Sequence, residues 1–139
     1  MINSQDIDIL ARTLYGEARG EYAKTGLSSL IAVGNVIINR WHTPHKPFGK
    51  TLGAVCLKPW QFSCWNENDP NRKVIENVTE QETLFKLCKT VSERIALCHW
   101  PDLTNGANHY HSTSLDKTPQ WAKGKKPIVT IGRHIFYKL

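Results

Sequence analysis

The chain has 139 residues, the length of one ordinary domain, and a chain of this size buries enough surface to fold without disulfides or a structural metal. A hydrophobic fraction of 40% and a charged fraction of 22% exclude an intrinsically disordered protein. The net charge of +6 favours an anionic partner, which leaves nucleic acid, anionic lipid and bacterial wall polymer as candidates.

The first helix is predicted to begin at Asn3 or Ser4, since either side chain can cap it. Its apolar residues recur with the spacing of one helical face: Ile7, Leu10, Ala11, Leu14 and Tyr15. Gly16 and Gly20 then weaken the helix on either side of Glu17, and glycines beside a carboxylate let a ligand or another segment approach the backbone closely. Glu17 is therefore the first candidate for a reacting group.

A second helix is predicted from about Gly26 to Arg40, where apolar residues occupy almost every side, as in a helix at the centre of a core. Residues 41–49 contain two prolines and a glycine and are expected to form a loop. A short helical turn is predicted from Thr51 to Leu57, and Pro59 stops it.

The best-marked helix follows a turn-rich segment at residues 66–71 and is predicted to begin with a capping box at residues 79–82 (TEQE). The side chains expected to point inward share one face of it: Leu84, Leu87, Cys88, Val91, Ile95 and Cys98. After Pro101 the pattern changes, because Ala107–Thr113 and Ile128–Tyr137 alternate as strands do. These elements predict an α+β fold, a helix-rich single domain over residues 1–139 with a small C-terminal β-sheet.

Four cysteines, at positions 56, 64, 88 and 98, show no Cys-x-x-Cys spacing, which argues against a zinc ribbon or a thioredoxin-like motif. On a helix, Cys88 and Cys98 would lie about 15 Å apart, beyond the Cα separation of about 7 Å that a disulfide allows. Cys56 and Cys64 flank a Pro-Trp loop, and they either pair with each other or remain free buried thiols.

The N-terminal segment, residues 1–6, has neither a positive region nor an apolar one, so no signal peptide is expected. The longest apolar-rich stretch, residues 27–38, is interrupted by polar residues and is shorter than the roughly 20 residues that span a bilayer. We therefore expect synthesis in the cytoplasm and no stable insertion into a membrane. No nucleic-acid-binding motif accompanies the positive charge, so a nucleic-acid partner is not expected.

Glu17 has two interpretations on the residues alone. At the end of an apolar helix, in a glycine-flanked turn, a carboxyl group is partly desolvated, which favours the protonated form that a general acid at a glycosidic bond requires. If the helix continues, Glu21 shares its face and adds like-charge repulsion. Alternatively, Glu17 is a surface residue paired with Arg12 or Arg19.

Four blocks of sequence follow one another along the chain: residues 15–21 (YGEARGE), 32–40 (AVGNVIINR), 55–63 (VCLKPWQFS), and the pair 106–111 (GANHYH) and 131–136 (IGRHIF). Together they resemble the spore-cortex-lytic (SleB/CwlJ-type) cell-wall hydrolase family, which has an opening motif, a core helix ending in Asn-Arg, a Gln-Phe-Ser loop and two last strands in this order. The resemblance runs from about residue 9 to the C-terminus, and four ordered blocks are far more specific than any one of them.

The resemblance implies a lysozyme-like catalytic domain that cuts the β-1,4 bond between N-acetylmuramic acid and N-acetylglucosamine, with Glu17 matching the family's catalytic glutamate. Several members are lytic transglycosylases, which leave a 1,6-anhydromuramoyl end instead of adding water. One glutamate can then serve as acid and as base, whereas ordinary glycosidases use two carboxylates. The alternatives are a hydrolytic muramidase or glucosaminidase on the same fold and a non-catalytic wall-binding module.

The substrate groove is predicted to be lined from three places in the chain: Glu21, Trp60, Gln61, Phe62, Ser63, His109, Tyr110 and His111. The amide of Gln61 and the hydroxyl of Ser63 are expected to bond sugar substituents. Trp60 and Trp65 are the candidates for stacking on sugar rings, whereas Phe62 has packing in the core as its alternative.

His109 and His111 lie two residues apart, so on a strand they point to one face and Tyr110 points to the other. A metal site there needs His134 to come near, yet no cysteine or carboxylate is placed to complete it, and the family resemblance implies no required metal. We therefore predict that both histidines line the groove or are hydrogen-bonded, with no metal and no cofactor.

A compact, basic, single-domain form without an export signal resembles a bacteriophage endolysin, which waits in the cytoplasm until a pore opens the inner membrane. The predicted partner is bacterial peptidoglycan, which the protein would reach in the periplasm after membrane permeabilisation. A monomer is expected.

Overall fold

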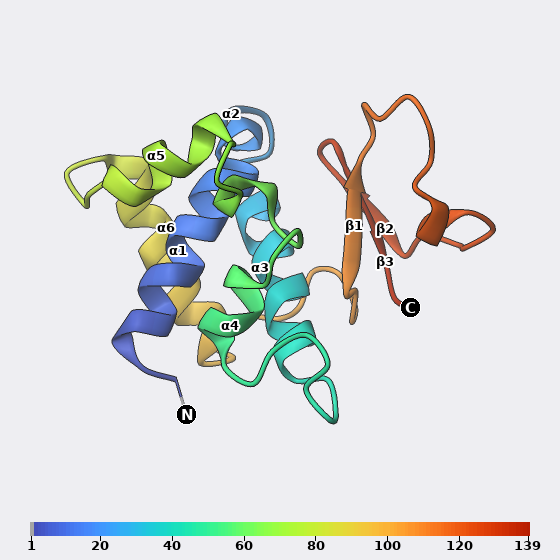
Figure 1. The fold of residues 1–139 in the computed structure, drawn as a ribbon, viewed down its shortest axis with the longest axis horizontal. Helices are drawn as coiled ribbons and strands as arrows, with labels where there is room; N and C mark the ends of the chain where they lie inside the picture. The colour runs from blue at the N-terminus through green and yellow to red at the C-terminus, as the bar shows by residue number, and fades with distance from the viewer. Residues whose placement is uncertain (1) are drawn as a thin grey trace.

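Residues 2–139 are described by a computed structural model, in which a group of helices lies beside a small sheet (Figure 1). The helices are α1 (Ser4–Ala18), α2 (Tyr22–Thr25), α3 (Leu27–Trp41), α4 (Leu52–Leu57), α5 (Pro70–Asn77) and α6 (Thr83–Ala96), with short 3₁₀ turns η1 (Arg19–Glu21), η2 (Ser63–Trp65) and η3 (Gln120–Ala122). The strands are β1 (His109–Ser112), β2 (Val129–Ile131) and β3 (His134–Tyr137). The predicted α+β class, with helices first and a small sheet last, is confirmed.

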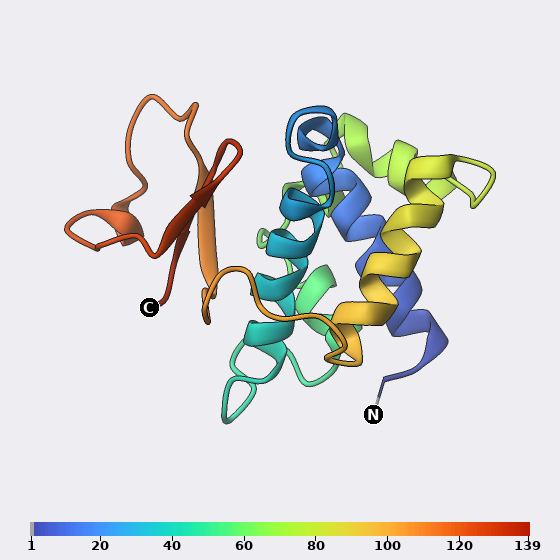
Figure 2. The same ribbon diagram turned by 180° about the vertical axis from the view of Figure 1, so that it is seen from behind.

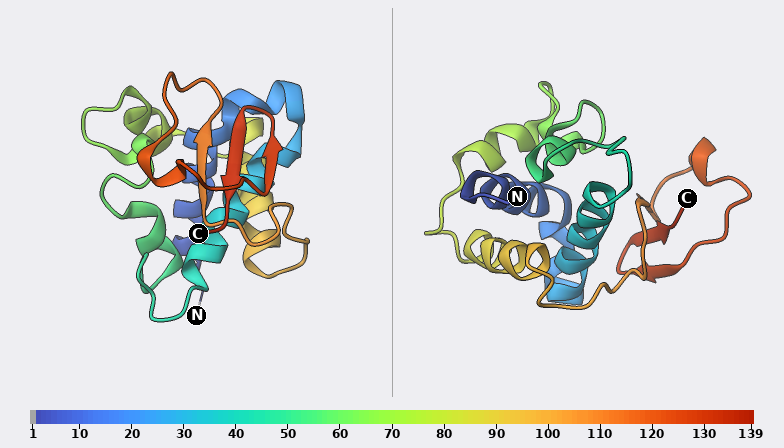
Figure 3. Two further views of the ribbon diagram at one scale, coloured as in Figure 1. Left: turned by 90° about the vertical axis from the view of Figure 1, so that its right-hand side faces the viewer. Right: turned by 90° about the horizontal axis from the view of Figure 1, so that it is seen from below.

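Helix α1 lies at the centre of the helical part, and its predicted cap is confirmed. The Asn3 side chain accepts from the backbone N–H of Asp6 at 2.8 Å, and the Asp6 carboxylate accepts from the backbone N–H of Asn3 at 3.2 Å. Leu10 and Leu14 of the apolar stripe are fully buried. The helix packs against α3, α4, α5 and α6, which surround it when the molecule is seen from below (Figure 3). This packing fixes the direction of α1 and so the position of Glu17 in its last turn.

Helix α3 is buried on almost every side, as predicted, and it belongs to two cores. One side joins the large core shared with α1 and α6. On the other side, Ala32 and Val36 pack against Ala107 and Phe136 of the sheet part. The sheet therefore docks on α3, and the segment after α6 passes α3 on its way to β1 (Figure 2). Within residues 2–139, neither α3 nor any other helix is both long and apolar enough to cross a bilayer.

The three strands pair antiparallel in the order β1-β3-β2. The register sets Tyr110 opposite Phe136 and Ser112 opposite His134. Because side chains alternate across a sheet, these residues share the face that docks on the helices, and His109 and His111 lie on the other face. Strand β1 thus brings Tyr110 toward the helical part.

The prediction of one strand over Ile128–Tyr137 is wrong, because the chain turns back at Gly132 to form β2 and β3. Gly132 has a φ of +58°, in the left-handed region that favours glycine. The apolar alternation continues on both sides of this turn, so the pattern does not reveal the break.

The predicted capping box at residues 79–82 does not start α6. The N-cap is Glu82, whose side chain accepts from the backbone N–H of Leu84 at 3.2 Å. The Thr79 hydroxyl instead accepts from the backbone N–H of Gln81 at 3.4 Å, within the turn before the helix.

The turn-rich residues 66–71 lead into a helix, α5, that the pattern does not predict. Asp69 is its N-cap and accepts from the backbone N–H of Asn71 at 2.8 Å, while Pro70 fills the first helical position. Proline is favoured at that position because its missing N–H has no partner inside the helix in any case.

The four cysteines are free thiols, with Cys56, Cys64 and Cys88 buried and Cys98 exposed. Of the two alternatives for Cys56 and Cys64, free buried thiols are therefore confirmed. Burial raises the pKa of Cys56 and of Cys88 to about 12, so both stay protonated. The prediction that Cys98 points inward is wrong, because the chain leaves the helix after Ala96 and Cys98 has a left-handed φ of +58°.

Candidate active site

Glu17 is half-buried at the end of α1, where the helices face the sheet. Its Oε1 accepts a hydrogen bond from the hydroxyl of Tyr110 at 2.8 Å, and its Oε2 accepts one from the backbone N–H of Cys64 at 3.3 Å. Three segments far apart in the sequence, α1, η2 and β1, therefore meet at one carboxyl group. Such a group has a fixed orientation, as proton transfer to a defined atom requires.

The approach of η2 to α1 depends on Gly16. A Cβ at this position would lie 2.7 Å from Cβ of Cys64 and 2.8 Å from its Sγ, so only glycine lets the Cys64 backbone reach Glu17. Trp65 fixes the other end of the same turn, because its indole N–H donates to the Thr13 hydroxyl at 2.9 Å. The close approach expected beside Glu17 is thus made by the protein's own chain.

Tyr110 is the donor that the sheet contributes. Burial of the hydroxyl, together with the charge of Glu17 beside it, raises the pKa of Tyr110 well above its usual value, so the hydroxyl remains protonated. Its ring packs against His134 and Phe136, with ring centroids 4.9 and 5.6 Å apart. Tyr110, predicted to line the groove, lies directly against Glu17.

A crevice of about 390 Å³ opens beside Glu17, between the end of α1, the start of α5 and the β2–β3 hairpin. Its polar lining includes Glu17, Arg19, Glu21, Asn71, Ser112, Arg133 and His134. A few fixed polar groups in a concave site orient a ligand that is rich in hydroxyl and amide groups.

Glu21 lies in this crevice, but its carboxylate is already bound. Oε1 accepts from the backbone N–H of Arg133 at 2.7 Å, and Oε2 accepts from Nε at 2.8 Å and pairs with the second guanidinium nitrogen at 2.7 Å. The Arg133 hydrogen bonds hold the pKa of Glu21 below its usual value, so Glu21 stays ionised. Because α1 ends at Ala18, Glu21 does not continue the helical face of Glu17. The Glu21–Arg133 pair instead joins the hairpin to the helical part.

His134 lies on the same face of the sheet as Tyr110. Burial lowers its pKa below the usual value of 6.5, which leaves the ring neutral at pH 7. Its Nδ1 is buried and finds no hydrogen-bond partner among residues 2–139. The crevice therefore holds a neutral imidazole next to the tyrosine that contacts Glu17.

Arg40 connects the core helix to the loop at residues 61–63. Its Nε donates to the carbonyl of Asn108 at 2.7 Å, and its Nη1 donates to Oε1 of Gln61 at 3.2 Å. The guanidinium lies 5.1 Å from the ring centroid of Phe48 and 5.3 Å from that of Phe62. Burial lowers the pKa of Arg40, and the two rings and two oxygens stabilise its charge.

The other predicted groove residues of this loop lie in different settings. Phe62 is 2% exposed and belongs to the core, which matches its packing alternative. Gln61 is exposed, although its amide oxygen accepts from Arg40, and Ser63 is exposed at the start of η2.

His109 and His111 lie on the opposite face from Tyr110. Their rings pack against Trp121, with centroids 5.0 and 5.7 Å apart, and Nε2 of His111 lies 3.0 Å from the hydroxyl of Tyr137. His134 is on the other face of the sheet, so the three histidines considered for a metal do not come together. In the part of the chain that the structure describes, no three His, Cys, Asp or Glu residues are placed to hold a metal ion.

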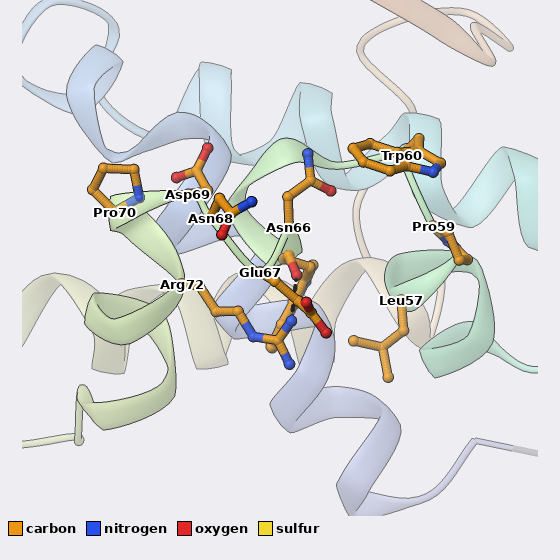
Figure 4. Close-up of a pocket in the computed structure, with 10 residues that line it drawn as sticks. Leu57, Pro59, Trp60, Asn66, Glu67, Asn68, Asp69, Pro70 and Arg72 are labelled. Atoms are coloured by element: carbon orange, nitrogen blue, oxygen red, sulfur yellow. Dashed lines mark hydrogen bonds between the residues drawn. The ribbon is translucent and has the colours of Figure 1, made fainter.

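Trp60 is 83% exposed and lies at the edge of a second hollow, between α4 and α5 (Figure 4). This hollow shares no lining residue with the crevice beside Glu17. Trp65 lines it as well, from the turn that contacts α1. The two tryptophans predicted to stack on sugars therefore lie together at this second hollow, and neither lines the crevice.

Residues 25–137 match the model of the family described as Cell Wall Hydrolase. The chain belongs to the cell wall hydrolase family. Among relatives of this cell wall hydrolase, the spore cortex-lytic enzyme of Bacillus subtilis (strain 168) is 28% identical over 136 residues, which are 96% of this chain and 38% of that protein. The spore cortex-lytic enzyme of Oceanobacillus iheyensis is 27% identical over 98% of this chain and 42% of that protein.

Solved structures resemble this cell wall hydrolase over almost its whole length. The catalytic domain of the Bacillus cereus SleB protein has a TM-score of 0.72 and 28% identity, covering 99% of this chain and 93% of that one. The catalytic domain of the germination-specific lytic transglycosylase SleB from Bacillus anthracis has a TM-score of 0.71 and 28% identity, covering 99% and 97%. Glu17 precedes the family match at residues 25–137, but helix α1 lies within these structural likenesses. The chain spans less than half the length of the spore cortex-lytic enzymes named above.

The sequence did not single out several groups around Glu17 in this cell wall hydrolase. The backbone N–H of Cys64, the hydroxyl of Ser112 and the side chain of Asn71 carry no local pattern that marks them. Arg133 and His134 belong to the last of the blocks that resemble the family, residues 131–136, and the available signal was that both directly follow Gly132.

Proposed function

We propose that this chain cleaves the β-1,4 bond between N-acetylmuramic acid and N-acetylglucosamine in bacterial peptidoglycan, as a lytic transglycosylase with Glu17 as its acid and base. Membership of the cell wall hydrolase family and the likeness to a domain named as a lytic transglycosylase support the reaction class.

One observation carries the proposal: of the two carboxylates that line the crevice within residues 2–139, Glu17 alone has no cationic partner. Glu21 is ionised and bound to Arg133 on both oxygens. A two-carboxylate glycosidase needs a second available carboxylate for the nucleophile or for the activated water. The arrangement therefore favours chemistry that one carboxyl group can complete.

In the proposed reaction, protonated Glu17 donates its proton to the glycosidic oxygen, and the bond from that oxygen to C1 of the muramoyl unit breaks. The Glu17 carboxylate then accepts the proton of the C6 hydroxyl of the same unit, and the C6 oxygen bonds to C1. This closes the 1,6-anhydro ring, returns Glu17 to its protonated state and consumes no water. Tyr110 and the Cys64 N–H hold the carboxylate in one orientation through both steps.

Among the predicted substrate contacts, we retain Tyr110, which reaches Glu17, and Ser63, which is exposed at the start of η2 beside Cys64. We also retain Trp60, which is exposed at the edge of the second hollow. Direct contact with the substrate remains a prediction for the other groove residues, whose contacts within the protein are described above: Glu21, Gln61, Phe62, His109 and His111. That the activity serves bacteriophage release, in the periplasm after the membrane is opened, also remains a prediction from the sequence.

Release of soluble muropeptides from purified sacculi tests the assignment of Glu17. We expect Glu17→Gln to lower the rate at least about 100-fold, because removal of a general acid costs about 10²- to 10⁴-fold. The matched variant Glu80→Gln changes an exposed glutamate elsewhere and should keep the parental rate. Equal release by the parent and by Glu17→Gln would contradict the assignment.

Mass spectrometry of the products tests the reaction type. An anhydro-muramoyl product is lighter by one water than the product of hydrolysis, so the two outcomes are separable. Products that all carry the added water would favour a hydrolytic muramidase or glucosaminidase on the same fold. Binding to sacculi without any release would favour a wall-binding module.

A further inference from the structure

The second hollow, of about 630 Å³, lies between the end of α4 and the start of α5 (Figure 4). Its volume falls within the range of about 300–1,000 Å³ typical of small-molecule sites. One side is apolar and is formed by Leu57, Pro59 and Trp60. The other side carries the polar side chains of Asn66, Glu67 and Asn68.

Trp60 gives the hollow a flat apolar wall that faces solvent. A tryptophan has a large apolar surface to gain by burial, yet this one is 83% exposed. Its backbone has a φ of +67°, which is uncommon for a residue other than glycine, and the next N–H, of Gln61, donates to the carbonyl of Lys58 at 3.2 Å. The turn therefore holds the indole ring at the edge of the hollow.

The side of the hollow near η2 is held in place by hydrogen bonds within the protein. The indole N–H of Trp65 is bonded to Thr13, and its carbonyl accepts from Nη1 of Arg72 at 2.8 Å. Nε of Arg72 also donates to the carboxylate of Glu76 at 3.4 Å. The one basic side chain lining the hollow, within the described residues, is thus engaged by the protein.

Three polar side chains remain available. The side-chain amides of Asn66 and Asn68 and the carboxylate of Glu67 make no hydrogen bond with another residue in the described range 2–139. An amide both donates and accepts, so it can bond the N-acetyl group and the hydroxyls of a sugar. An aromatic face beside such groups suits the C–H face of a pyranose ring.

The charges of the hollow indicate whether it binds the peptide stems or the sugar units of peptidoglycan. Glu67 and Asp69 bring negative charge, and Arg72 is engaged, so the carboxylates of a peptide stem are disfavoured here. An uncharged sugar unit meets no such repulsion. We propose that the hollow binds an N-acetylhexosamine unit of the glycan strand, with Trp60 as the stacking platform and Asn66 and Asn68 as its hydrogen-bonding groups.

This site adjoins the crevice and rests on the proposed function for its place in catalysis. Cys64 donates its N–H to Glu17, and the next residue, Trp65, lines the hollow. Pro70 lines the hollow, and the next residue, Asn71, lines the crevice. A unit bound in the hollow therefore extends the contact with the strand beyond the unit whose bond is cut.

Titration with the N-acetylglucosamine tetramer tests the site, monitored by NMR in a Glu17→Gln background so that the probe is not consumed. We expect shifts of the side-chain amide signals of Asn66 and Asn68. Trp60→Ala should weaken binding by about tenfold, the effect of losing one aromatic contact, and Trp60→Phe should keep most of the affinity. Leu97→Ala is the matched control, because Leu97 is 58% exposed beyond the end of α6.

Parental affinity in Trp60→Ala, shifts confined to Ser112 and His134 of the crevice, or no binding of the tetramer would each overturn this site. A different result would contradict the proposed function: a Glu17→Gln variant with Trp60 intact would release muropeptides at the parental rate. A Trp60-dependent tetramer site would stand in that case, as a binding site without the proposed catalysis beside it.

Discussion

The helical part, residues 2–105, and the sheet part, residues 106–139, differ in the way their charges are balanced. Residues 1–105 contain 12 lysines and arginines against 11 acidic residues, whereas residues 106–139 contain 6 against 1. In the helical part, Asp8 pairs with both Arg12 and Lys89. In the sheet part, the ion pair found within the described residues is Arg133 with Glu21, which belongs to the helical part.

The two parts also contribute different groups to the site. The helical part supplies Glu17 and the Cys64 N–H, and the sheet part supplies Tyr110 and His134. The site therefore forms only when the sheet is docked on α3. Each contact across this boundary can be changed separately, which tests how far the two parts depend on each other.

The largest effect is expected for Phe136→Ala, which removes the aromatic ring through which β3 packs on α3. Phe136 is fully buried, and truncation of a buried phenylalanine costs about 3–5 kcal/mol of unfolding free energy. Urea denaturation followed by tryptophan fluorescence measures it. Leu139→Ala, at an exposed residue of the same part, should change stability by less than about 0.5 kcal/mol. Similar values for the two variants would mean that the sheet does not depend on this contact.

Gly16→Ala should have the next largest effect. The test is whether the substitution raises or lowers the free energy of unfolding. Helix propensity alone predicts a gain of about 0.5–1 kcal/mol, because alanine replaces glycine within α1. The clash with Cys64 instead predicts a loss of about 1–3 kcal/mol and at least a roughly tenfold loss of muropeptide release, because η2 moves away from Glu17. Gly20→Ala meets nothing within 4 Å and should preserve both properties. A stabilised, fully active Gly16→Ala variant would rule out the contact.

Glu21→Gln should weaken the link between the parts in a pH-dependent way. The pKa of Glu21 lies below 4.5 in the folded state, so folding favours the ionised carboxylate. The contribution of the Glu21–Arg133 pair to stability is present at pH values above 4.5, and it is lost as the pH falls through the folded-state pKa of Glu21. Melting temperatures of the parent and Glu21→Gln should therefore differ at pH 7 and converge at acidic pH. Glu76→Gln, in an exposed pair, should show little difference at either pH; parallel curves for Glu21→Gln would contradict the pair's role.

The smallest effect on the fold is expected from the lysines of the sheet part. Lys117, Lys123 and Lys125 are exposed and form no ion pair with any residue from 2 to 139, so their joint change to glutamine should leave the melting temperature unchanged. Binding of the Glu17→Gln chain to sacculi at low salt should weaken, since the positive charge attracts an anionic wall.

The matched control removes the same charge from the helical part, by changing Lys24, Lys73 and Lys86 to glutamine. These three side chains are exposed as well. If both triple variants bind equally weakly at low salt, the total charge matters and its location on the sheet part does not.

Sequence patterns predicted the elements that are determined by residues close together in the chain. The Asn3 cap, the apolar stripe of α1 and the apolar surround of α3 follow from side-chain types at fixed spacings, and the structure has them. Helix α5 was missed because Asp69-Pro70 is typical of a turn and equally typical of a helix start. The hairpin at Gly132 was missed because alternation has the same period on both sides of it.

The sequence predicted Glu17 at the centre of the candidate site and Tyr110 in the groove, but not the contact between them. Glu17 was indicated by its glycine-flanked turn and by the ordered blocks around it. Its donor Tyr110 lies 93 residues away in the chain, and no local pattern encodes which strand face meets which helix end. The partner of Glu21 was equally hidden, because helix α1 ends before that residue and the carboxylate reaches a hairpin 112 residues further on.

The distribution of the four thiols makes the folded chain selectively reactive. Cys56, Cys64 and Cys88 are buried, and burial raises the pKa of each, so their reactive thiolate forms are scarce. Cys98 is exposed and follows α6, and the C-terminal end of α6 lies at the opposite end of the helical part from the C-terminal end of α1 (Figure 2). A maleimide dye therefore attaches to the native chain at one defined position away from Glu17, and the uptake of further dye marks the moment at which the helical core opens.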